Sequence, residues 1–395
     1  MEKYTRKSFL GQLQLAGAAG LASIVLPSDP HVPRPDLAST DPALTGPSSS
    51  SGKKLNIALC GLGNYAGLLA DGLEASQYCR LAGIVTGHPA KATAWKAKYK
   101  LPDKNVYDYQ NFDEIVHNPS IDLVYVVLPN GLHKDFTVRA AKAGKHVICE
   151  KPMATSASNC REMIKACKDA GVQLAIGYRL HFEPTHLEIK RLGQQKVFGQ
   201  VRFIEASLGY QTYDGKEAAT GYQAGNPAHW RLNKVLAGGG PLMDLGIYCI
   251  QSSRYVLGEE PVTVTAQFGP TRAPKLFSQV EEAISWQLTF PSGAVCNSTT
   301  SCGYDVDRFF ATADEGQFEL SPALSYGPFL GKSSKGPIRF PVINQQATEM
   351  DTIAKLILEN KALPSHITGE EGIKDVRIIE AIYEAARTGG KVKLV

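Results

Sequence analysis

The sequence predicts an α/β protein of two domains: a doubly wound parallel domain, then an α/β domain with an open, mostly antiparallel sheet. Three observations support this prediction. A glycine-rich turn lies between a predicted strand and a predicted helix, strands and helices then alternate to about residue 177, and closely spaced strands dominate the remainder. The length of 395 residues suits two domains of ordinary size.

Composition and charge exclude several classes of protein. Apolar residues make up 43% of the chain and charged residues 20%, which is enough apolar material for a large core. The net charge of +4 is small, and no basic stripe or lysine-rich tail indicates binding to nucleic acid. The eight cysteines form no Cys-x-x-Cys pair and no zinc-type cluster with histidine, so we expect free, buried thiols and no metal site.

Residues 1–26 have the pattern of an export signal. Lys3, Arg6 and Lys7 precede an apolar stretch that is rich in Ala and Gly and too short to span a membrane with ease. The start resembles a twin-arginine signal with Lys7 in place of the second arginine, so we expect a periplasmic protein that has no membrane segment in its mature form. The alternative is a disordered basic tail on a cytoplasmic protein. Residues 27–53 are rich in Pro and Ser, which is typical of an extended arm.

The glycine-rich turn has the sequence Gly61-Leu62-Gly63-Asn64-Tyr65-Ala66. It follows a predicted strand over residues 54–60 and precedes a predicted helix over 68–74, which is the context that a dinucleotide fingerprint requires. The first glycine permits the tight turn, and the second lets the backbone approach a pyrophosphate at the helix N-terminus. The pattern therefore predicts a Rossmann domain over residues 54–177.

The end of the second predicted strand, residues 80–85, bears on the choice of cofactor. An NAD-binding domain usually carries an acidic residue there for the ribose 2′-hydroxyl, whereas this chain has Thr86-Gly87-His88. Thr86, His88 and Lys91 could instead receive a 2′-phosphate, so we expect NADP rather than NAD. The alternative is that Lys91 is only a solvated residue of the following helix.

The alternation continues with strands over residues 122–128, 146–149 and 173–176 and helices over 134–143 and 156–170. Ligands of such sheets bind beyond the carboxyl ends of the strands, where Asn130 and Lys151 lie. In the run Cys149-Glu150-Lys151-Pro152, the lysine could reach both a nicotinamide and a substrate hydroxyl. Pro152 restricts the backbone of Lys151 and could form a cis bond. The alternative is an exposed ion pair between Glu150 and Lys151.

Residues 178–395 should form the substrate-binding and oligomerisation domain. Strands are expected over residues 201–208, 262–268, 283–290, 294–301 and 308–313, and helices over 344–359 and 370–387 should pack on or beside their sheet. The open face of the sheet is a candidate oligomer surface. After three glycines at 238–240, Asp244 and Tyr248 share one helix face, and with Lys151 they would form a proton-handling trio. Alternatively, Tyr248 is a core aromatic and Asp244 a capping residue.

Several segments together resemble the glucose–fructose oxidoreductase/inositol dehydrogenase (Gfo/Idh/MocA) family, above all its glucose–fructose branch. They are the glycine turn, Val106-Tyr107-Asp108-Tyr109, Leu128-Pro129-Asn130, Glu150-Lys151-Pro152, Gly177-Tyr178-Arg179, Trp230-Arg231-Leu232 and residues 238–248. The resemblance implies that Lys151 lies at the nicotinamide, that Tyr248 accepts or donates the proton and that Asp244 binds substrate. It implies cofactor contacts from Gly61, Leu62, Gly63, Asn64, Tyr65, Thr86, Gly87, Lys91, Leu128, Pro129, Asn130, His133, Glu150, Lys151, Arg179, Trp230 and Arg231.

The resemblance also implies a function. We expect an NADP-dependent oxidoreductase of pyranose or polyol hydroxyls that holds its cofactor tightly and reduces a second carbonyl sugar in a ping-pong cycle. In the glucose–fructose branch, the N-terminal arm helps to hold NADP and contributes to a tetramer, so a homodimer or homotetramer is expected. Residues 210–227 depart from the family pattern and should border the sugar site. Two alternatives stay open: a nicotinamide-dependent glycosidase acting through transient oxidation, and a non-catalytic NADP-binding sensor.

Overall fold

The computed structural model describes residues 52–212 and 227–394. The predicted export signal, residues 27–51 of the arm and residues 213–226 lie outside the described part of the chain. Residues 53–395 form one compact unit. Two sheets, each with its own hydrophobic core, make up this unit, and we refer to them with their helices as the first and second lobes.

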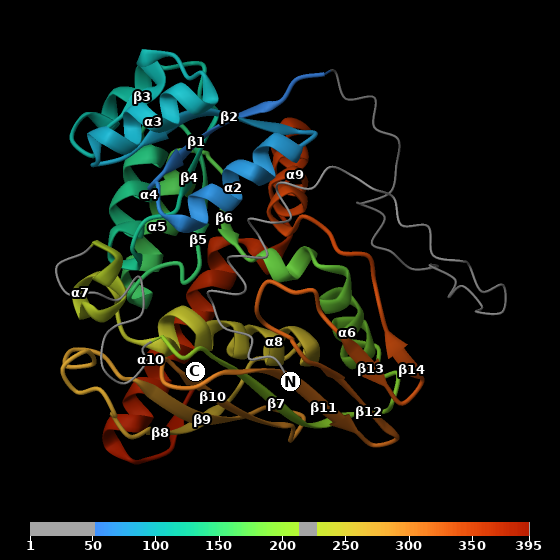
Figure 1. The fold of residues 1–395 in the computed structure, drawn as a ribbon. Helices are drawn as coiled ribbons and strands as arrows, with labels where there is room; N and C mark the ends of the chain where they lie inside the picture. Colours follow the sequence, from blue (N-terminus) through green and yellow to red (C-terminus); the bar gives the residue numbers. More distant parts are fainter. Residues whose placement is uncertain (1–51, 213–226, 395) are drawn as a thin grey trace. The chain divides into compact units, whose positions relative to one another are not determined.

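The first lobe is built on a six-stranded sheet in which all neighbouring strands run parallel (Figure 1). The strand order is β3-β2-β1-β4-β5-β6, which is the doubly wound order that the glycine turn predicted. All four residues of the central strand β4 are buried, as expected when helices cover both faces of a parallel sheet. The strands are β1 (Leu55–Cys60), β2 (Cys79–Val85), β3 (Val106–Tyr107), β4 (Leu123–Val126), β5 (His146–Glu150) and β6 (Leu174–Gly177).

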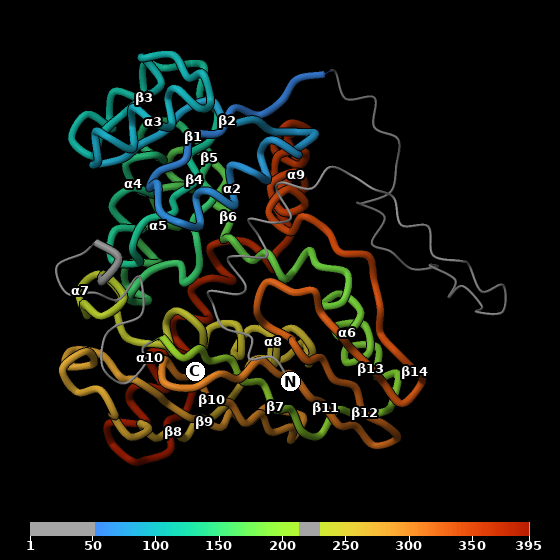
Figure 2. Tube along the Cα trace, in the orientation of Figure 1, coloured from blue at the N-terminus to red at the C-terminus, as the bar shows by residue number. Residues whose placement is uncertain are grey.

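Four helices connect these strands: α2 (Asn64–Ala75), α3 (Pro89–Tyr99), α4 (His133–Lys142) and α5 (Ala157–Asp169). A fifth helix, α9 (Gln345–Leu358), comes from far down the chain, and its Met350, Ile353 and Ala354 belong to the core of the first lobe. Figure 2 shows α9 beside α2, where a Cβ atom added to Gly72 would lie 2.9 Å from the Cβ of Gln346. The expectation that this helix packs with the second sheet is therefore wrong, because its apolar face matches α2 of the first lobe.

The second lobe contains a nine-stranded sheet in the order β14-β13-β12-β11-β7-β10-β9-β8-β15. Only β7 and β10 pair in parallel, so the sheet is mostly antiparallel, as predicted. The strands are β7 (Val201–Gly209), β8 (Thr263–Phe268), β9 (Ala283–Thr289), β10 (Val295–Ser301), β11 (Val306–Ala313), β12 (Gly316–Leu320), β13 (Gly331–Ser333), β14 (Gly336–Ile338) and β15 (Val392–Lys393). The last four were not predicted because they are too short to show a clear alternation.

One face of this sheet is covered and the other is open. Helices α8 (Ile247–Leu257) and α10 (Gly369–Thr388) pack against it, and α6 (Pro184–Gln194) packs against α8. In β9, Ile284, Trp286 and Leu288 are buried, whereas Ser285 and Gln287 are exposed. Polar side chains on the open face account for this alternation. The role of the open face as an oligomer surface stays a prediction.

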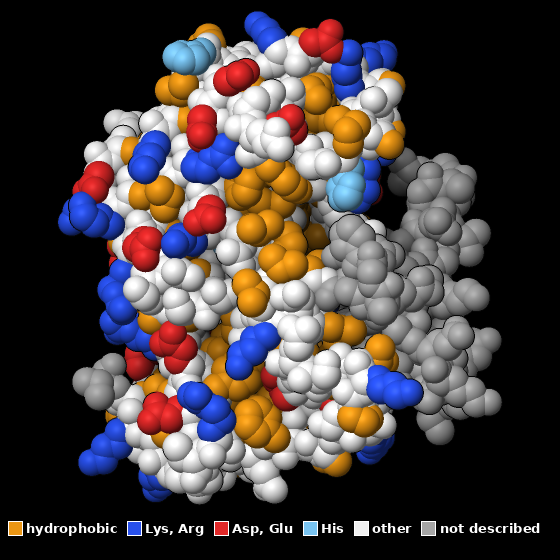
Figure 3. All heavy atoms as spheres, turned by 90° about the vertical axis from the view of Figure 1, so that its left-hand side faces the viewer, with side chains coloured by type: hydrophobic (Ala, Val, Ile, Leu, Met, Phe, Trp, Pro, Cys, Tyr) orange, Lys and Arg blue, Asp and Glu red, His pale blue; other side chains and the backbone are white. Residues whose placement is uncertain are grey.

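The surface and the thiols agree with the composition. Figure 3 shows Lys and Arg interspersed with Asp and Glu on the face it presents, with no stripe of one sign on that face. All eight cysteines are free and buried, as predicted. Among residues 52–212 and 227–394, no helix combines the length and the hydropathy needed to cross a bilayer.

Candidate active site

The glycine turn forms one edge of the site. Strand β1 ends at Cys60, Gly61 adopts a positive φ of 104°, and α2 begins at Asn64. A Cβ atom on Gly61 would lie 2.7 Å from the carbonyl oxygen of Val127, so only glycine fits between the two strand ends. Backbone N–H groups in the first turn of α2 have no partner within the helix and suit a pyrophosphate. This strand, turn and helix therefore fit a dinucleotide, with Gly61, Leu62, Gly63, Asn64 and Tyr65 to hold it.

The end of β2 lies next to this turn. Lys91 extends from α3 and donates a hydrogen bond from Nζ to the carbonyl of Leu62, at 3.0 Å. Thr86 is buried, and its Oγ1 accepts a hydrogen bond from the backbone N–H of His88 at 3.2 Å. A Cβ atom on Gly87 would meet the ring of Tyr109 at 2.8 Å. A cation, a hydroxyl and a helix N-terminus thus lie together beside the glycine turn, which is the set of groups that a 2′-phosphate would require.

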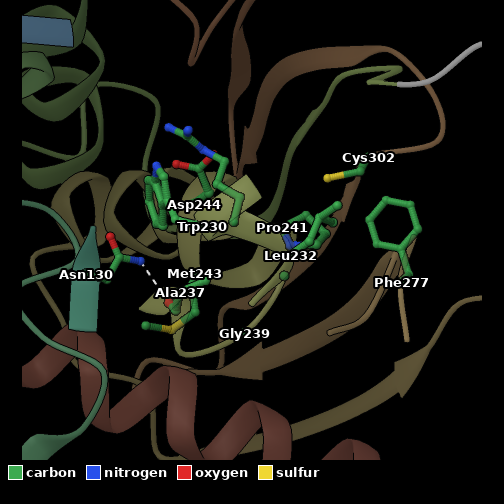
Figure 4. Close-up of a pocket in the computed structure, with 12 residues that line it drawn as sticks. Asn130, Trp230, Leu232, Ala237, Gly239, Pro241, Met243, Asp244, Phe277 and Cys302 are labelled. Atoms are coloured by element: carbon green, nitrogen blue, oxygen red, sulfur yellow. Dashed lines mark hydrogen bonds and ion pairs between the residues drawn. The ribbon is translucent and has the colours of Figure 1, made fainter. Parts of the chain in front are cut away.

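The ends of β4 and β5 provide two further loops. Asn130 donates from Nδ2 to the carbonyl of Ala237 at 2.9 Å, so the amide ties the first lobe to the helix α7 (Lys234–Ala237) (Figure 4). His133, a predicted cofactor contact, is only 1% exposed. Its Nδ1 lies 3.0 Å from the carbonyl of Pro152 and its Nε2 lies 2.7 Å from that of Leu128. The ring therefore braces the Pro129 and Lys151 loops from beneath rather than presenting a nitrogen to a ligand.

Burial lowers the pKa of His133, and the neutral ring carries a single N–H. Only one of its two carbonyl contacts is therefore a hydrogen bond in which the ring donates.

Lys151 crosses from the first lobe to the second. Its Nζ donates to the backbone carbonyl of Asp244 at 2.8 Å and lies 3.8 Å from Oδ1 of the same residue. The ammonium also lies 4.4 Å from the centre of the Tyr248 ring. The side chain of Lys151 is 11% exposed and Glu150 is 8% exposed, so an exposed ion pair between these two neighbours is excluded. The Lys151–Pro152 bond is cis, as the sequence allowed.

Asp244 lies in a π-helical turn, Leu242–Gly246, that leads into α8. We predicted an ordinary helix here, and the wider turn is of the kind often found at functional sites. The Asp244 carboxylate accepts a hydrogen bond from Nε of Arg231 at 2.7 Å, and the Arg231 guanidinium lies 4.4 Å over the Trp230 ring. Asp244 therefore lies between two cations from different segments and inside the turn, so the alternative that it caps the helix is wrong.

Tyr248 is flanked by a second cation. The Arg179 guanidinium lies 5.0 Å from the Tyr248 ring centre and 4.3 Å from that of Tyr326. Arg179 is 2% exposed, and it donates to Oε1 of Gln345 at 2.5 Å and to the carbonyl of Leu324 at 3.2 Å. The structure places the Arg179 guanidinium against the rings of Tyr248 and Tyr326, and the role of Arg179 as a cofactor contact stays a prediction.

Three of these residues were missed from the sequence. Tyr326 and Leu324 lie in a loop after β12, and Gln345 opens α9. No motif marks them, because they reach Arg179 only through the return of the chain to the first lobe. A tyrosine among Pro and Gly residues was the one available signal.

A shallow pocket lies beside this cluster, with about 280 Å³ of space not filled by atoms when the solvent at its open mouth is included. Trp230, Asp244 and Pro241 lie together in Figure 4, with Asn130 on one side and Phe277 and Cys302 on the other. An apolar wall with a few convergent polar groups is typical of a site for a small polar ligand.

Two family models match the chain. Residues 55–178 match the model described as the GFO/IDH/MocA oxidoreductase family with an NAD-binding Rossmann fold. Residues 186–319 match the GFO/IDH/MocA C-terminal domain. Together they cover most of the part that forms the two lobes.

Known proteins agree with these matches. The chain is 40% identical to an aldose–aldose oxidoreductase from Caulobacter crescentus, solved with glycerol, with a TM-score of 0.79 over 87% of this chain and 100% of that one. It is 28% identical over 332 residues to an NADP(+) D-xylose 1-dehydrogenase from Haloarcula marismortui, covering 82% of this chain and 88% of that protein. It is 28% identical over 287 residues to a 1,5-anhydro-D-fructose reductase from Ensifer adhaerens, covering 70% and 81%. The chain belongs to the GFO/IDH/MocA family and is a nicotinamide-dependent oxidoreductase.

Proposed function

We propose that this chain is an NADP-dependent oxidoreductase that interconverts a hydroxyl and a carbonyl of a sugar. The observation that carries the proposal is the contact of Lys151 with both Asp244 and Tyr248, at the carboxyl edge of the dinucleotide-binding sheet. The relatives support a sugar as substrate and NADP as cofactor, because an aldose–aldose oxidoreductase and an NADP(+) D-xylose 1-dehydrogenase are among them.

Tyr248 acts as the proton acceptor in oxidation and as the donor in reduction. When bound, the nicotinamide supplies the hydride acceptor or donor. The ammonium of Lys151 and the guanidinium of Arg179 flank the phenol ring, at 4.4 and 5.0 Å from its centre. Both cations stabilise the phenol oxygen as it loses its proton.

Asp244 binds the sugar through its carboxylate, and Arg231, which we predicted as a cofactor contact, holds that carboxylate in place. A carboxylate accepts hydrogen bonds from hydroxyls, and its ion pair with Arg231 fixes its orientation at 2.7 Å. The Trp230 ring, which carries the Arg231 guanidinium, also lines the pocket and presents an apolar surface to the C–H groups of a pyranose. The pair thus positions one hydroxyl of the ring near Tyr248.

We also propose that the cofactor stays bound through two half-reactions. Tyr248 takes a proton from a first sugar, and the same phenol returns a proton to a carbonyl of a second sugar at the same site. Protein purified without added cofactor should show nicotinamide absorbance and fluorescence, and an aldose should change that spectrum without release of the cofactor. A protein that is free of cofactor, and that turns over only with added NADP, would contradict retention.

Product analysis separates the proposal from its rivals. A screen of aldoses and ketoses should yield one oxidised and one reduced sugar in equal amounts. A nicotinamide-dependent glycosidase would instead release reducing sugar from glycosides with no net redox change. A cofactor spectrum that no sugar alters would favour a sensor.

We further propose export to the periplasm and assembly into a homodimer or homotetramer. The basic and apolar pattern of residues 1–26 and the Pro/Ser-rich arm support export. Cell fractionation and light scattering test the two statements separately: an unprocessed cytoplasmic chain would contradict the first, and a monomer would contradict the second.

A further inference from the structure

A buried acidic cluster lies behind Lys151. Glu150 ends β5, Tyr125 lies on β4 and Glu349 lies on α9, so three elements supply it. Glu150 is 8% exposed, and Tyr125 and Glu349 are both at 0%. The Tyr125 hydroxyl lies 2.8 Å from Oε1 of Glu150 and 3.4 Å from Oε2 of Glu349. Two carboxyl groups thus share one phenol in the interior.

The charge of this cluster can be inferred from the number of O–H groups available for its hydrogen bonds. A phenol carries one O–H, so it donates fully to only one of the two carboxyl groups. The shorter distance identifies Glu150 as the acceptor. The other oxygen of Glu349, Oε1, is buried and has no hydrogen-bond partner among residues 52–212 and 227–394. An ionised carboxylate with a bare oxygen and a second carboxylate nearby is very unfavourable in the interior, whereas a neutral carboxylic acid needs only one partner for its O–H.

We propose that Glu349 is a protonated carboxylic acid whose O–H donates to Tyr125, which in turn donates to the Glu150 carboxylate, and that this chain positions Lys151. Glu349 and Tyr125 are positioning residues, because they touch neither substrate nor cofactor. The catalytic consequence rests on the proposed function, whereas the protonation of Glu349 does not.

The electrostatic environment supports this assignment. Burial raises the pKa of Glu349 well above its usual range, and the Glu150 charge raises it further. Burial also raises the pKa of Glu150, to about 7, although Lys151 and Arg179 oppose the rise. The pair therefore releases its first proton from Glu150 and keeps the second on Glu349. The charged or titratable groups that face the pair are Tyr65, Tyr125, Lys151, Arg179 and Tyr326.

The chain of hydrogen bonds reaches Lys151 through the backbone. The N–H of Lys151 lies 3.3 Å from Oε2 of Glu150, so the direction of the carboxylate affects the path by which the lysine leaves β5. With one proton held on Glu349, a single negative charge faces the Lys151 ammonium from within. If Glu349 were ionised too, the extra charge would offset the effect of Lys151 and Arg179 on Tyr248.

Infrared spectroscopy tests the protonation directly. At a pH well above 7, where Glu150 is ionised, the wild-type protein should show the carbonyl stretch of a buried carboxylic acid, with the small downshift that deuterium exchange causes. Glu349→Gln should remove this band. Glu384→Gln, at an exposed position of α10, is the matched control and should leave it. A spectrum with no such band, or a band that survives in Glu349→Gln, would overturn the proposal whether or not the protein oxidises sugars.

The pH dependence of kcat/KM tests the positioning role. Tyr125→Phe removes the hydrogen-bond donor to Glu150, so it should raise the pKa of Glu150 and move the acidic limb upward by about one pH unit. Glu349→Leu removes only the donor to Tyr125, so it should shift the limb in the same direction by a smaller amount. Glu349→Gln keeps an N–H donor and should bring the limb back toward that of the wild type. A downward shift in Glu349→Leu would mean that removal of a charge had relieved repulsion, and it would overturn the neutral assignment. If Glu349→Leu does not fold, Tyr125→Phe and the Gln variant decide.

Discussion

The two edges of the active site are assembled in opposite ways. On the predicted cofactor side, five residues follow one another along the chain, and Lys91 reaches them from the next helix: Gly61, Leu62, Gly63, Asn64 and Tyr65. On the chemical side, Lys151 and Asp244 meet although they are 93 positions apart. A turn is formed by consecutive residues and can therefore be recognised in the sequence. The cluster around Lys151 forms only when residues from both lobes come together.

The two edges also differ in burial. Lys91 is exposed, so water and salt screen its charge. The side chains of Lys151 and Asp244 are 11% and 26% exposed, and Arg179 is 2% exposed. Charges in the cluster therefore act more strongly than those at the cofactor edge. Substitutions in the two regions should differ in size and in the step that they affect.

The largest effect is expected at Tyr248. Tyr248→Phe removes the phenol O–H and should lower kcat by about 10²- to 10⁴-fold, with the amount of bound cofactor unchanged, because proton transfer is lost while the dinucleotide edge is intact. Steady-state kinetics and the cofactor spectrum of the purified variant measure the two quantities. Tyr255→Phe, two turns further along α8, is the matched control. Equal turnover in both variants would remove Tyr248 from the chemistry.

The next effect is expected at the glycine turn. Gly61→Ala places a Cβ atom against the Val127 carbonyl at a positive φ, and it should lower the free energy of unfolding by about 3 kcal/mol and weaken cofactor binding. Gly144→Ala is a control that has the backbone strain without the steric clash. Gly144 also has a positive φ, of 70°, but no described atom lies within 4 Å of its added Cβ. That control should cost about 1 kcal/mol and leave binding unchanged. Denaturant titration measures the free energy of unfolding of both variants. An equal loss in Gly61→Ala and Gly144→Ala would show that the contact between the added Cβ atom and the Val127 carbonyl is unimportant.

A third effect, on stability, is expected from Glu150. Its pKa is about 7 in the folded protein against an ordinary value of 4.5, so between these pH values the folded state binds more protons than the unfolded state. The contribution of Glu150 to the free energy of unfolding should therefore fall as pH rises from 4.5 to 7, by at most about 3 kcal/mol. Urea titrations of wild type and Glu150→Gln across this range measure the slope. An unchanged slope would show that Glu150 ionises normally.

The smallest effect is expected at Lys91. Lys91→Ala should weaken NADP binding by about tenfold and leave NAD binding nearly unchanged, as expected for one partly screened contact with a 2′-phosphate. Titration of cofactor-stripped protein with each dinucleotide measures both affinities, and Lys98→Ala on the same helix is the control. An equal loss for NAD and NADP would assign Lys91 to the glycine turn alone, through its hydrogen bond to Leu62.

Much of the architecture could be predicted from the chain. The strand, turn and helix around Gly61 specify their own geometry, and the apolar strands with intervening helices specify a parallel sheet. The helix over residues 344–359 was correctly placed in sequence but was assigned to the wrong lobe. Its periodicity shows that it has an apolar face but not which surface that face meets, and α2 proved to be the partner.

The fold class, the glycine turn and the lysine, aspartate and tyrosine of the candidate site could all be identified from the chain before its structure was known. The surroundings of these residues became visible only in the folded chain: Arg179 lies against the Tyr248 ring, Arg231 pairs with the Asp244 carboxylate, and Glu349 lies against Tyr125. The reason is physical. Backbone turns and apolar periodicity depend on neighbours along the chain, whereas the charge state of a buried group depends on side chains that meet only after the two lobes have packed.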